Sequence, residues 1–222
     1  MAETIIRSFD DLHKAVSTHD HNIVIYRGLK SVDYDLIPRL GREKLKGTQP
    51  LKAEQTILRL FREQAYQYVS DHNLKDWDWL ALAQHHGLPT RLMDWTRNPL
   101  VAAYFAVEKE HDGDSVIWVY SERHFINTDS WPDPFKRGEA GRFIPNHVTR
   151  RITAQMGVFT FHPDWELPFE SPELSKMIIR NKDNFRKQLK RTLYTYGIHR
   201  ASLFPDIDGL AAHITWLRTK GH

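Results

Sequence analysis

The spacing of apolar residues, together with the residues that start and stop helices, predicts six helices. Between residues 53 and 69 the apolar positions lie on one helical face. Asn98 followed by Pro99 is a typical helix start, and the nearly apolar segment after it is expected to lie at the centre of the fold. The predicted helices begin near Ser8, cover about 53–69, 76–86, 99–107 and 184–196, and end with a helix after Pro205.

Short apolar runs predict buried strands at 22–28, 116–120, 158–161 and 177–179. The stretch between the second and third of these strands is rich in turn residues and is predicted to be a surface loop; it contains Pro132, Pro134, Gly138 and Gly141. No internal repeat or linker divides the chain. We therefore predict a single α+β domain over residues 1–222, with a mixed, mostly antiparallel sheet and flanking helices.

The composition narrows the class of protein. No apolar run approaches the roughly 18–20 residues that span a bilayer, and the N-terminus has no apolar signal core, so we expect no membrane association. The chain has no Cys, which excludes disulfides, a thiol nucleophile and Cys-ligated metals and favours the cytoplasm. A net charge of +3 and a pI of about 9.0 permit polyanion binding without the charge density of a dedicated nucleic-acid-binding protein.

The most unusual segment runs from Gln84 to Pro99 and is predicted to be a loop between two helices. Its charged and titratable residues are His85, His86, Arg91, Asp94 and Arg97. Such density on a loop indicates either a functional site or a buried polar network. In the network interpretation Arg91 pairs with Asp94 and a histidine caps the preceding helix.

Two further positions supply donors of the same kind. Arg27 ends a hydrophobic strand beside Gly28, where an arginine can bind a phosphate or carboxylate and a glycine lets a ligand approach the backbone. The alternative is an arginine paired with an internal acid such as Asp94. Arg151 and Gln155 are four residues apart, on one face if their segment is helical, and would complete a set of guanidinium and amide donors for a phosphate-bearing ligand.

The sequence does not predict a metal site. His85 and His86 are adjacent and diverge around a helix, and the chain has no His-x-x-x-His pair. Asp206 and Asp208 are predicted to be the N-terminal carboxylates of the last helix.

The helix predicted at 184–196 is basic. Lys182, Arg186 and Lys190 follow one another at four-residue spacing. This spacing favours a solvated face, with a nucleic-acid contact as the alternative.

Four motifs together resemble the FRG domain family. They are Tyr26-Arg27-Gly28, the run from Gln84 to Thr96 followed by Asn98-Pro99, Arg151-x-x-x-Gln155-x-Gly157-x-Phe159, and the run from Leu203 to Leu210. The resemblance extends from about residue 8 to about residue 217. The family is named for its Phe/Tyr-Arg-Gly motif and occurs widely in bacteria and phages, so membership alone implies little about activity.

The order of these motifs is also similar to that of the ADP-ribosyltransferase fold, which implies a site for NAD. In that layout Arg27 would contact the ribose or diphosphate, and the backbone of Gly28 would contact the carboxamide. The implied NAD-binding set is Tyr26, Arg27, Gly28, Gln84, Thr90, Arg91 and Arg151.

The catalytic part of this resemblance has a gap. The late Glu of that fold has no counterpart, and Gln155, the nearest residue, can hold a ribose hydroxyl but cannot act as a base. The remaining candidates for a base are His85, His86 and Asp94. If none of them serves, the protein binds a nucleotide without turning it over.

Three hypotheses about function remain open at this point. The resemblance implies an NAD-binding, ADP-ribosyltransferase-like protein, as in a toxin or anti-phage effector with a nucleic-acid or protein acceptor and an antitoxin. The second is a metal-dependent nuclease or phosphoesterase that uses His85, His86 and Asp94 with Asp206 or Asp208. The third is a non-enzymatic module that binds nucleotide or nucleic acid through its arginines and the basic helix.

Overall fold

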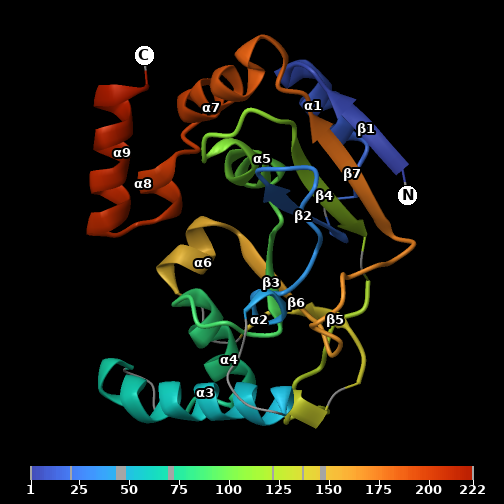
Figure 1. Ribbon diagram of the computed structural model, residues 1–222, viewed down its shortest axis with the longest axis vertical. Helices are drawn as coiled ribbons and strands as arrows, with labels where there is room; N and C mark the ends of the chain where they lie inside the picture. Colours follow the sequence, from blue (N-terminus) through green and yellow to red (C-terminus); the bar gives the residue numbers. More distant parts are fainter. Residues whose placement is uncertain are drawn as a thin grey trace.

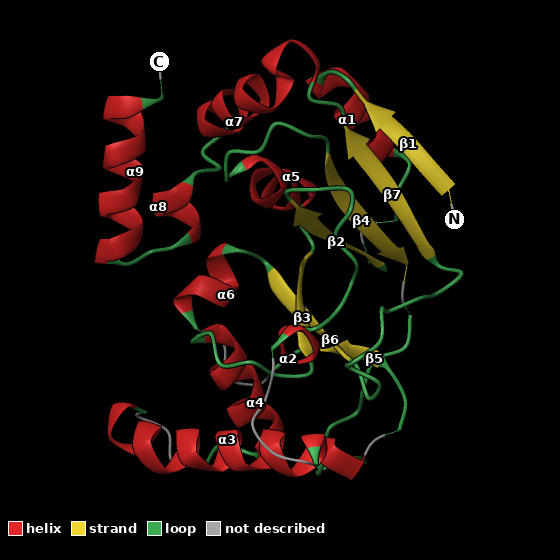
Figure 2. Cartoon of the chain, in the orientation of Figure 1, coloured by secondary structure: helices red, strands yellow, loops and turns green. Residues whose placement is uncertain are grey.

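A computed structural model of the chain describes residues 2–20, 22–43, 49–69, 73–121, 123–136, 138–145 and 149–221. These residues form a seven-stranded mixed sheet with the strand order β1-β7-β4-β2-β3-β6-β5 and helices packed around it (Figures 1 and 2). Neighbouring strands are antiparallel except β1 and β7, which are parallel. The α+β class and the mostly antiparallel sheet are therefore confirmed.

The strands are β1 (Ala2–Ile6), β2 (Val24–Leu29), β3 (Leu92–Thr96), β4 (Ser115–Ser121), β5 (Gly141–Phe143), β6 (Gly157–Phe161) and β7 (Leu174–Ile179). The α-helices are α1 (Phe9–Ser17), α2 (Arg39–Arg42), α3 (Pro50–Ala65), α4 (Asp76–His85), α5 (Pro99–Val107), α6 (Arg150–Ala154), α7 (Phe185–Thr195), α8 (Arg200–Leu203) and α9 (Ile207–Thr219). Short 3₁₀ turns cover Tyr66–Tyr68, Pro134–Lys136 and Lys182–Asn184. Each helix of this part of the chain is too short or too polar to span a lipid bilayer.

The sheet divides between β2 and β3. These strands are paired only at Tyr26 and Thr96. Beyond that pair β2 continues along β4 to Leu29, whereas β3 is paired along its whole length with β6. The two parts of the sheet, β1-β7-β4-β2 and β3-β6-β5, therefore separate at the ends of β2 and β3 that carry the chemistry predicted above.

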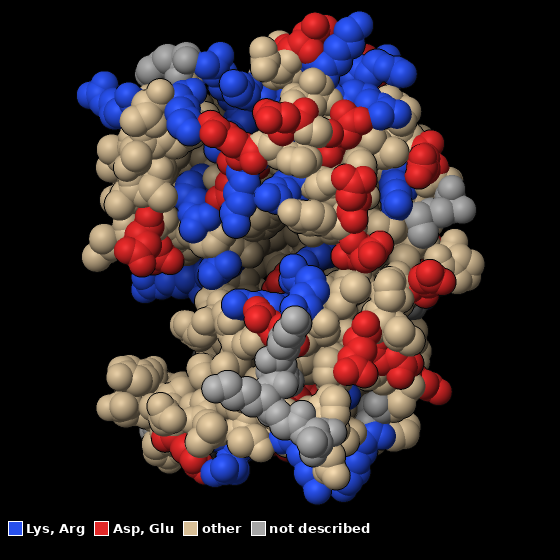
Figure 3. Space-filling view, viewed as in Figure 1, with Lys and Arg blue, Asp and Glu red and all other residues tan. Residues whose placement is uncertain are grey.

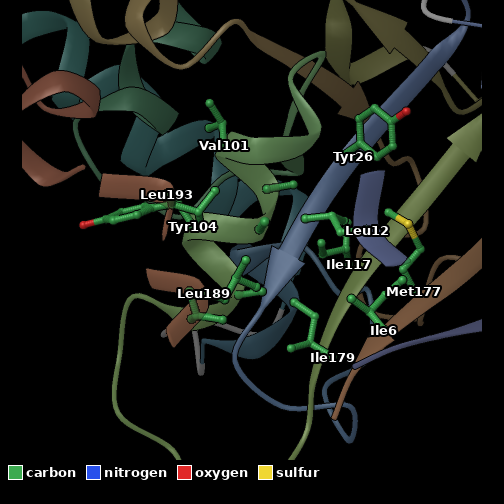
Figure 4. Packing of buried hydrophobic residues seen from close by; sticks show 14 of the residues in the cluster. Ile6, Leu12, Tyr26, Val101, Tyr104, Ile117, Met177, Ile179, Leu189 and Leu193 are labelled. Atoms are coloured by element: carbon green, nitrogen blue, oxygen red, sulfur yellow. The ribbon is translucent and has the colours of Figure 1, made fainter. Parts of the chain in front are cut away.

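Helix α5 lies at the centre of the larger core, as its composition predicts. Asn98 caps it by accepting a hydrogen bond from the backbone N–H of Leu100, and Pro99 occupies its first turn. The helix packs on β2 within a cluster of buried residues from α1, α7, β4 and β7 (Figure 4). Contact is closest at Gly28, where an added Cβ would lie 1.8 Å from the carbonyl oxygen of Ala102.

A second core fills the space between α3, α4 and the sheet part β3-β6-β5. The ring of Trp77 contacts the rings of Phe143 and Phe161, with centroids 4.9 and 5.1 Å away. These rings are buried in one cluster with aliphatic residues of α3, α4 and β3.

The structure corrects the prediction of a loop from Gln84 to Pro99, because Leu92–Thr96 is strand β3. All of its residues except Asp94 are buried, but the polar residues Asp94 and Thr96 interrupt the apolar run by which a buried strand is recognised. Strands β1 and β5 were also missed. Both are edge strands of the sheet, and β5 has only three residues and begins at Gly141, inside the predicted surface loop.

Gly28 provides a test of the packing between β2 and α5. We expect Gly28→Ala to lower the free energy of unfolding by at least about 3 kcal/mol, because the methyl group would meet backbone that cannot move without shifting the helix. Chemical denaturation would measure the change. Gly138→Ala is the matched control, since nothing lies within 4 Å of the added Cβ there. Equal stability of the two variants would contradict this packing.

Candidate functional site

A cleft of about 880 Å³ opens where β2 and β3 separate. Its walls come from the end of β2, α2, the end of α4, β3, the end of α5, α6 and the segment before α9. Figure 3 shows a hollow between the parts of the molecule that carry α5 and α6, with charged side chains around it. Its volume lies in the upper part of the roughly 300–1,000 Å³ range of ligand-binding pockets.

The lining of this cleft is predominantly basic. Of its described lining residues, seven are Lys or Arg and three are Asp or Glu. The basic residues are Arg27, Lys30, Arg39, Arg42, Lys109, Arg150 and Arg151, and the acidic ones are Asp94, Glu108 and Asp206. Such an excess in a concave surface concentrates positive potential and favours an anionic ligand.

Arg27 bridges the gap between the two parts of the sheet. Its Nη1 donates a 2.5 Å hydrogen bond to the backbone oxygen of Asp94 and lies 3.8 Å from the carboxylate of the same residue. Its Nε is buried and has no hydrogen-bond partner among the described residues. Burial lowers the pKa of Arg27, and Asp94 opposes that shift. The arginine stays charged at neutral pH and keeps donors that a ligand could use.

The carboxylate of Asp94 is held in place by a short chain of hydrogen bonds. The hydroxyl of Thr90 donates to Oε1 of Gln84 over 2.7 Å, and Nε2 of Gln84 donates to Oδ2 of Asp94 over 2.9 Å. Thr90 is buried, whereas 57% of the Asp94 side chain is exposed. The chain therefore orients an accessible carboxylate beside Arg27.

The backbone of Gly28 faces the cleft. Backbone directions alternate along a strand, and Arg91 and Arg97, on either side of β3, are hydrogen-bonded to the β6 side. Asp94 therefore points its backbone groups toward β2, in agreement with its bond to Arg27. The pair formed by Tyr26 sets the same alternation in β2. It directs the N–H and C=O of Gly28 into the gap beyond the last paired residues.

His85 and His86 lie at the end of α4 with their rings perpendicular and their centroids 4.9 Å apart. Burial, reinforced by Arg151, lowers the pKa of His85 to about 4, and burial also lowers the pKa of His86. Both rings are therefore neutral at pH 7. Nε2 of His85 lies 3.3 Å from the hydroxyl of Thr149.

Arg151 and Gln155 lie on the short helix α6 or at its end, and both border the cleft. The guanidinium of Arg151 lies 4.4 Å from the ring centroid of Phe204. Nε2 of Gln155 donates a 3.0 Å hydrogen bond to the backbone oxygen of Leu203. Gln155 thus ties α6 to α8 as well as lining the cleft.

Three residues of the implied NAD-binding set point their side chains elsewhere. Tyr26 is fully buried in the core and its hydroxyl contacts Nδ1 of His19 over 2.8 Å. Thr90 does not line the cleft; its hydroxyl donates to Gln84 and accepts a 3.1 Å hydrogen bond from the backbone N–H of Leu92. Arg91 does not line the cleft, because its buried guanidinium pairs with both carboxylate oxygens of Glu54 on α3. The expected Arg91–Asp94 pair is therefore wrong. The carboxylate that pairs with Arg91 belongs to Glu54, which is far away in the sequence, so local spacing could not predict it.

Gly28 has a packing requirement in addition to its expected role at the cleft. The glycine is required by α5, which presses on its Cα, and the cleft receives only its backbone groups. A close ligand approach alone would not explain the residue.

The basic face predicted on α7 is largely used inside the molecule. Arg186 donates to backbone oxygens of Ala106 and Lys109, and Lys190 donates to that of Glu108. These carbonyls lie at the end of α5, where a helix leaves acceptors without internal partners. The expected solvated face is corrected at these two positions, and neither contributes an exposed cation for nucleic acid.

Within the described ranges, no three His, Cys, Asp or Glu side chains are close enough to hold a metal ion. Asp206 accepts a 2.6 Å hydrogen bond from the N–H of Gly209 and caps α9, as predicted. The sequence interpretation missed the contribution of Lys30, Arg39 and Arg42 to the cleft, since isolated surface cations give no signal in one sequence.

A buried polar chain lies behind Arg27. Nε1 of Trp95 donates to Oγ1 of Thr160 over 2.7 Å, and that oxygen lies 2.6 Å from Nε2 of His162. Burial, with a smaller effect of Arg27, lowers the pKa of His162 to about 3. Because His162 is neutral, no second positive charge is buried near Arg27.

The fold and the cleft define an α+β protein with a basic cleft at a divided sheet. Residues 22–115 match the FRG domain family, and the chain contains an FRG domain over this stretch. The match includes Arg27, the Gln84–Asp94 chain and α5, whereas α6 and the last helices lie outside it. No curated protein and no solved structure matches the chain.

The buried pair of Arg91 and Glu54 can be tested with a matched control on the same helix. We expect Glu54→Gln to lower the free energy of unfolding by about 3–5 kcal/mol, because it leaves a buried guanidinium without its counter-charge. Glu63→Gln removes an exposed pair with Arg59 and should cost less than about 1 kcal/mol. Urea denaturation would give both values, and similar losses would refute a structural role for the buried pair.

The lowered histidine pKa values predict a pH dependence of stability. In the unfolded chain, histidines take up protons below about pH 6.5. In the folded protein the pKa of His162 is lowered to about 3 and that of His85 to about 4, so both rings stay neutral until the pH approaches these values. The free energy of unfolding should therefore fall as the pH drops from 6.5 toward 4, by up to about 1.4 kcal/mol per pH unit for each of them. His162→Gln should make this slope shallower in denaturation measured across that range. An unchanged slope would contradict the burial of a neutral ring.

Proposed function

We propose that the cleft binds an NAD-like dinucleotide and that the protein acts as an ADP-ribosyltransferase-like enzyme. The observation that carries this proposal is the arrangement of Arg27 and Asp94 on opposite sides of the gap between β2 and β3, with the backbone of Gly28 beside them. The basic lining suits the diphosphate of such a ligand.

Each part of the nicotinamide half has a matching group in the cleft. A carboxamide presents one donor group and one acceptor, and the C=O and N–H of Gly28 complement both. The exposed carboxylate of Asp94 can accept hydrogen bonds from ribose hydroxyls, while Arg27 supplies positive charge for a neighbouring phosphate. The cleft volume of about 880 Å³ admits a ligand larger than a mononucleotide.

The chemistry that follows is heterolytic cleavage of the bond between the ribose C1′ and the nicotinamide nitrogen. The electron pair leaves with nicotinamide, C1′ becomes oxocarbenium-like, and a nucleophile of the acceptor bonds to C1′ and gives up a proton. In this proposal Asp94 stabilises the developing positive charge and takes that proton. Gln155 cannot do so, because an amide is not a base and its nitrogen is engaged with Leu203.

Binding and turnover should separate in two variants. We expect NAD and ADP-ribose to raise the melting temperature of the wild type, and Arg27→Gln to weaken their binding at least ten-fold in calorimetric titration, because it removes the charge at the gap. Asp94→Asn should keep NAD affinity within a few-fold and slow nicotinamide release by about 100-fold. Arg59→Gln, an exposed change on α3, is the control for both measurements.

The outcomes distinguish three functions. No binding of NAD or ADP-ribose by the folded wild type would refute the proposal. Binding without nicotinamide release, with or without an acceptor, would assign the cleft to a nucleotide-binding module. Stabilisation by magnesium alone would favour the metal-dependent alternative.

A further inference from the structure

A second cavity of about 250 Å³ lies beside the cleft and is lined by residues from the end of α5 and from helices α7, α8 and α9. Figure 1 shows how these helices are arranged. Glu108 and Lys109 border both the cleft and this side pocket. The two spaces are therefore neighbours with a shared wall, and the smaller one has a volume below the usual range for a whole dinucleotide but suited to one ring system.

The wall of the side pocket is unusually aromatic. The rings that line it belong to Tyr104, Tyr194, His199, His213 and Trp216. His199 and His213 stack with centroids 4.2 Å apart and planes 12° from parallel. Tyr194 lies 5.8 Å from Trp216 and remains 39% exposed. Flat rings of this kind form stacking surfaces for nucleobases.

The charges around the side pocket exclude an ammonium ligand. Glu108 is the one carboxylate among its described lining residues, and it accepts a 2.5 Å hydrogen bond from Arg200. Lys109, Lys190 and Arg200 outnumber it, and Nζ of Lys190 already lies 5.1 Å from the ring centroid of Trp216. This excess of positive charge would repel a cationic ligand, so the pocket fits a neutral heterocycle attached to an anionic group.

The buried ring of Phe204 lies between an arginine of the cleft and an arginine of the side pocket. The guanidinium of Arg151, which borders the cleft, lies 4.4 Å from its ring centroid, and that of Arg200, which borders the side pocket, lies 3.7 Å from it. The two guanidinium groups therefore lie close together, one from each cavity. Phosphates that link a group in the cleft to a group in the side pocket would pass close to both.

We infer that the side pocket binds the adenine base of the dinucleotide whose nicotinamide half lies in the cleft. This inference rests on the proposed function and deepens it, because it divides the ligand between two separate sites. The aromatic wall supplies stacking, and the shared border supplies continuity between the two halves.

Two adjacent alanines of α9 allow a matched test. Ala212 lines the side pocket, whereas Ala211 does not, and both are exposed. We expect Ala212→Phe to fill the pocket and weaken binding of AMP and ADP-ribose at least ten-fold in calorimetric titration. Binding of nicotinamide mononucleotide should stay within two-fold of the wild type. Ala211→Phe should leave all three affinities within two-fold, and the smaller Ala212→Leu should act in the same direction as Ala212→Phe.

The result separates this inference from the proposed function. If the wild type binds NAD and folded Ala212→Phe binds AMP and ADP-ribose as the wild type does, the side pocket is not the adenine site and the cleft proposal stands. If nicotinamide mononucleotide weakens equally, the two halves of the ligand are not divided in this way. Failure of the wild type to bind NAD would overturn both proposals.

Discussion

The contact between β2 and α5 at Gly28 determines the positions of most groups discussed above. Because the helix lies directly against the strand backbone, the end of α5 is fixed relative to the last residues of β2. Donors from α7 then satisfy the carbonyls at that end, and this brings Arg186 and Lys190 inward instead of into solvent. Residues at the end of α5 line both the cleft and the side pocket, so this packing contact positions a wall of each.

Local rules predicted the elements whose signals are contiguous in the sequence. The N-cap and proline before α5 and the glycine after α4 have the structural consequences that helix chemistry assigns them. Strand β3 was not predicted because the polar residues Asp94 and Thr96 interrupt its apolar run. Asp94 lines the cleft, and Thr96 forms the one backbone pair with β2. The site was thus the place where the hydrophobic pattern was least informative.

Candidate residues could be found from the sequence, but their roles could not be assigned. The sequence interpretation put Arg27, Gln84 and Arg151 in the NAD-binding set and Asp94 among the candidate bases, and all four border the cleft. It could not distinguish them from Arg91, because the partner that buries Arg91 is Glu54, on a helix with no local relation to it. Charge alone does not separate a ligand-binding arginine from a structural one; the location of the nearest carboxylate does.

The single residue pair that joins β2 and β3 has a mechanical consequence. Backbone pairing between the two parts of the sheet is limited to Tyr26 and Thr96, so their connection depends on side-chain packing, in a buried cluster that includes Ile25, Met93 and Trp95. The hydrogen bond from Arg27 to the Asp94 carbonyl joins the two parts next to this residue pair. A molecule held by Gly28 on one side and Asp94 on the other would act as a cross-link between the two parts of the sheet, beside the one place where their backbones meet.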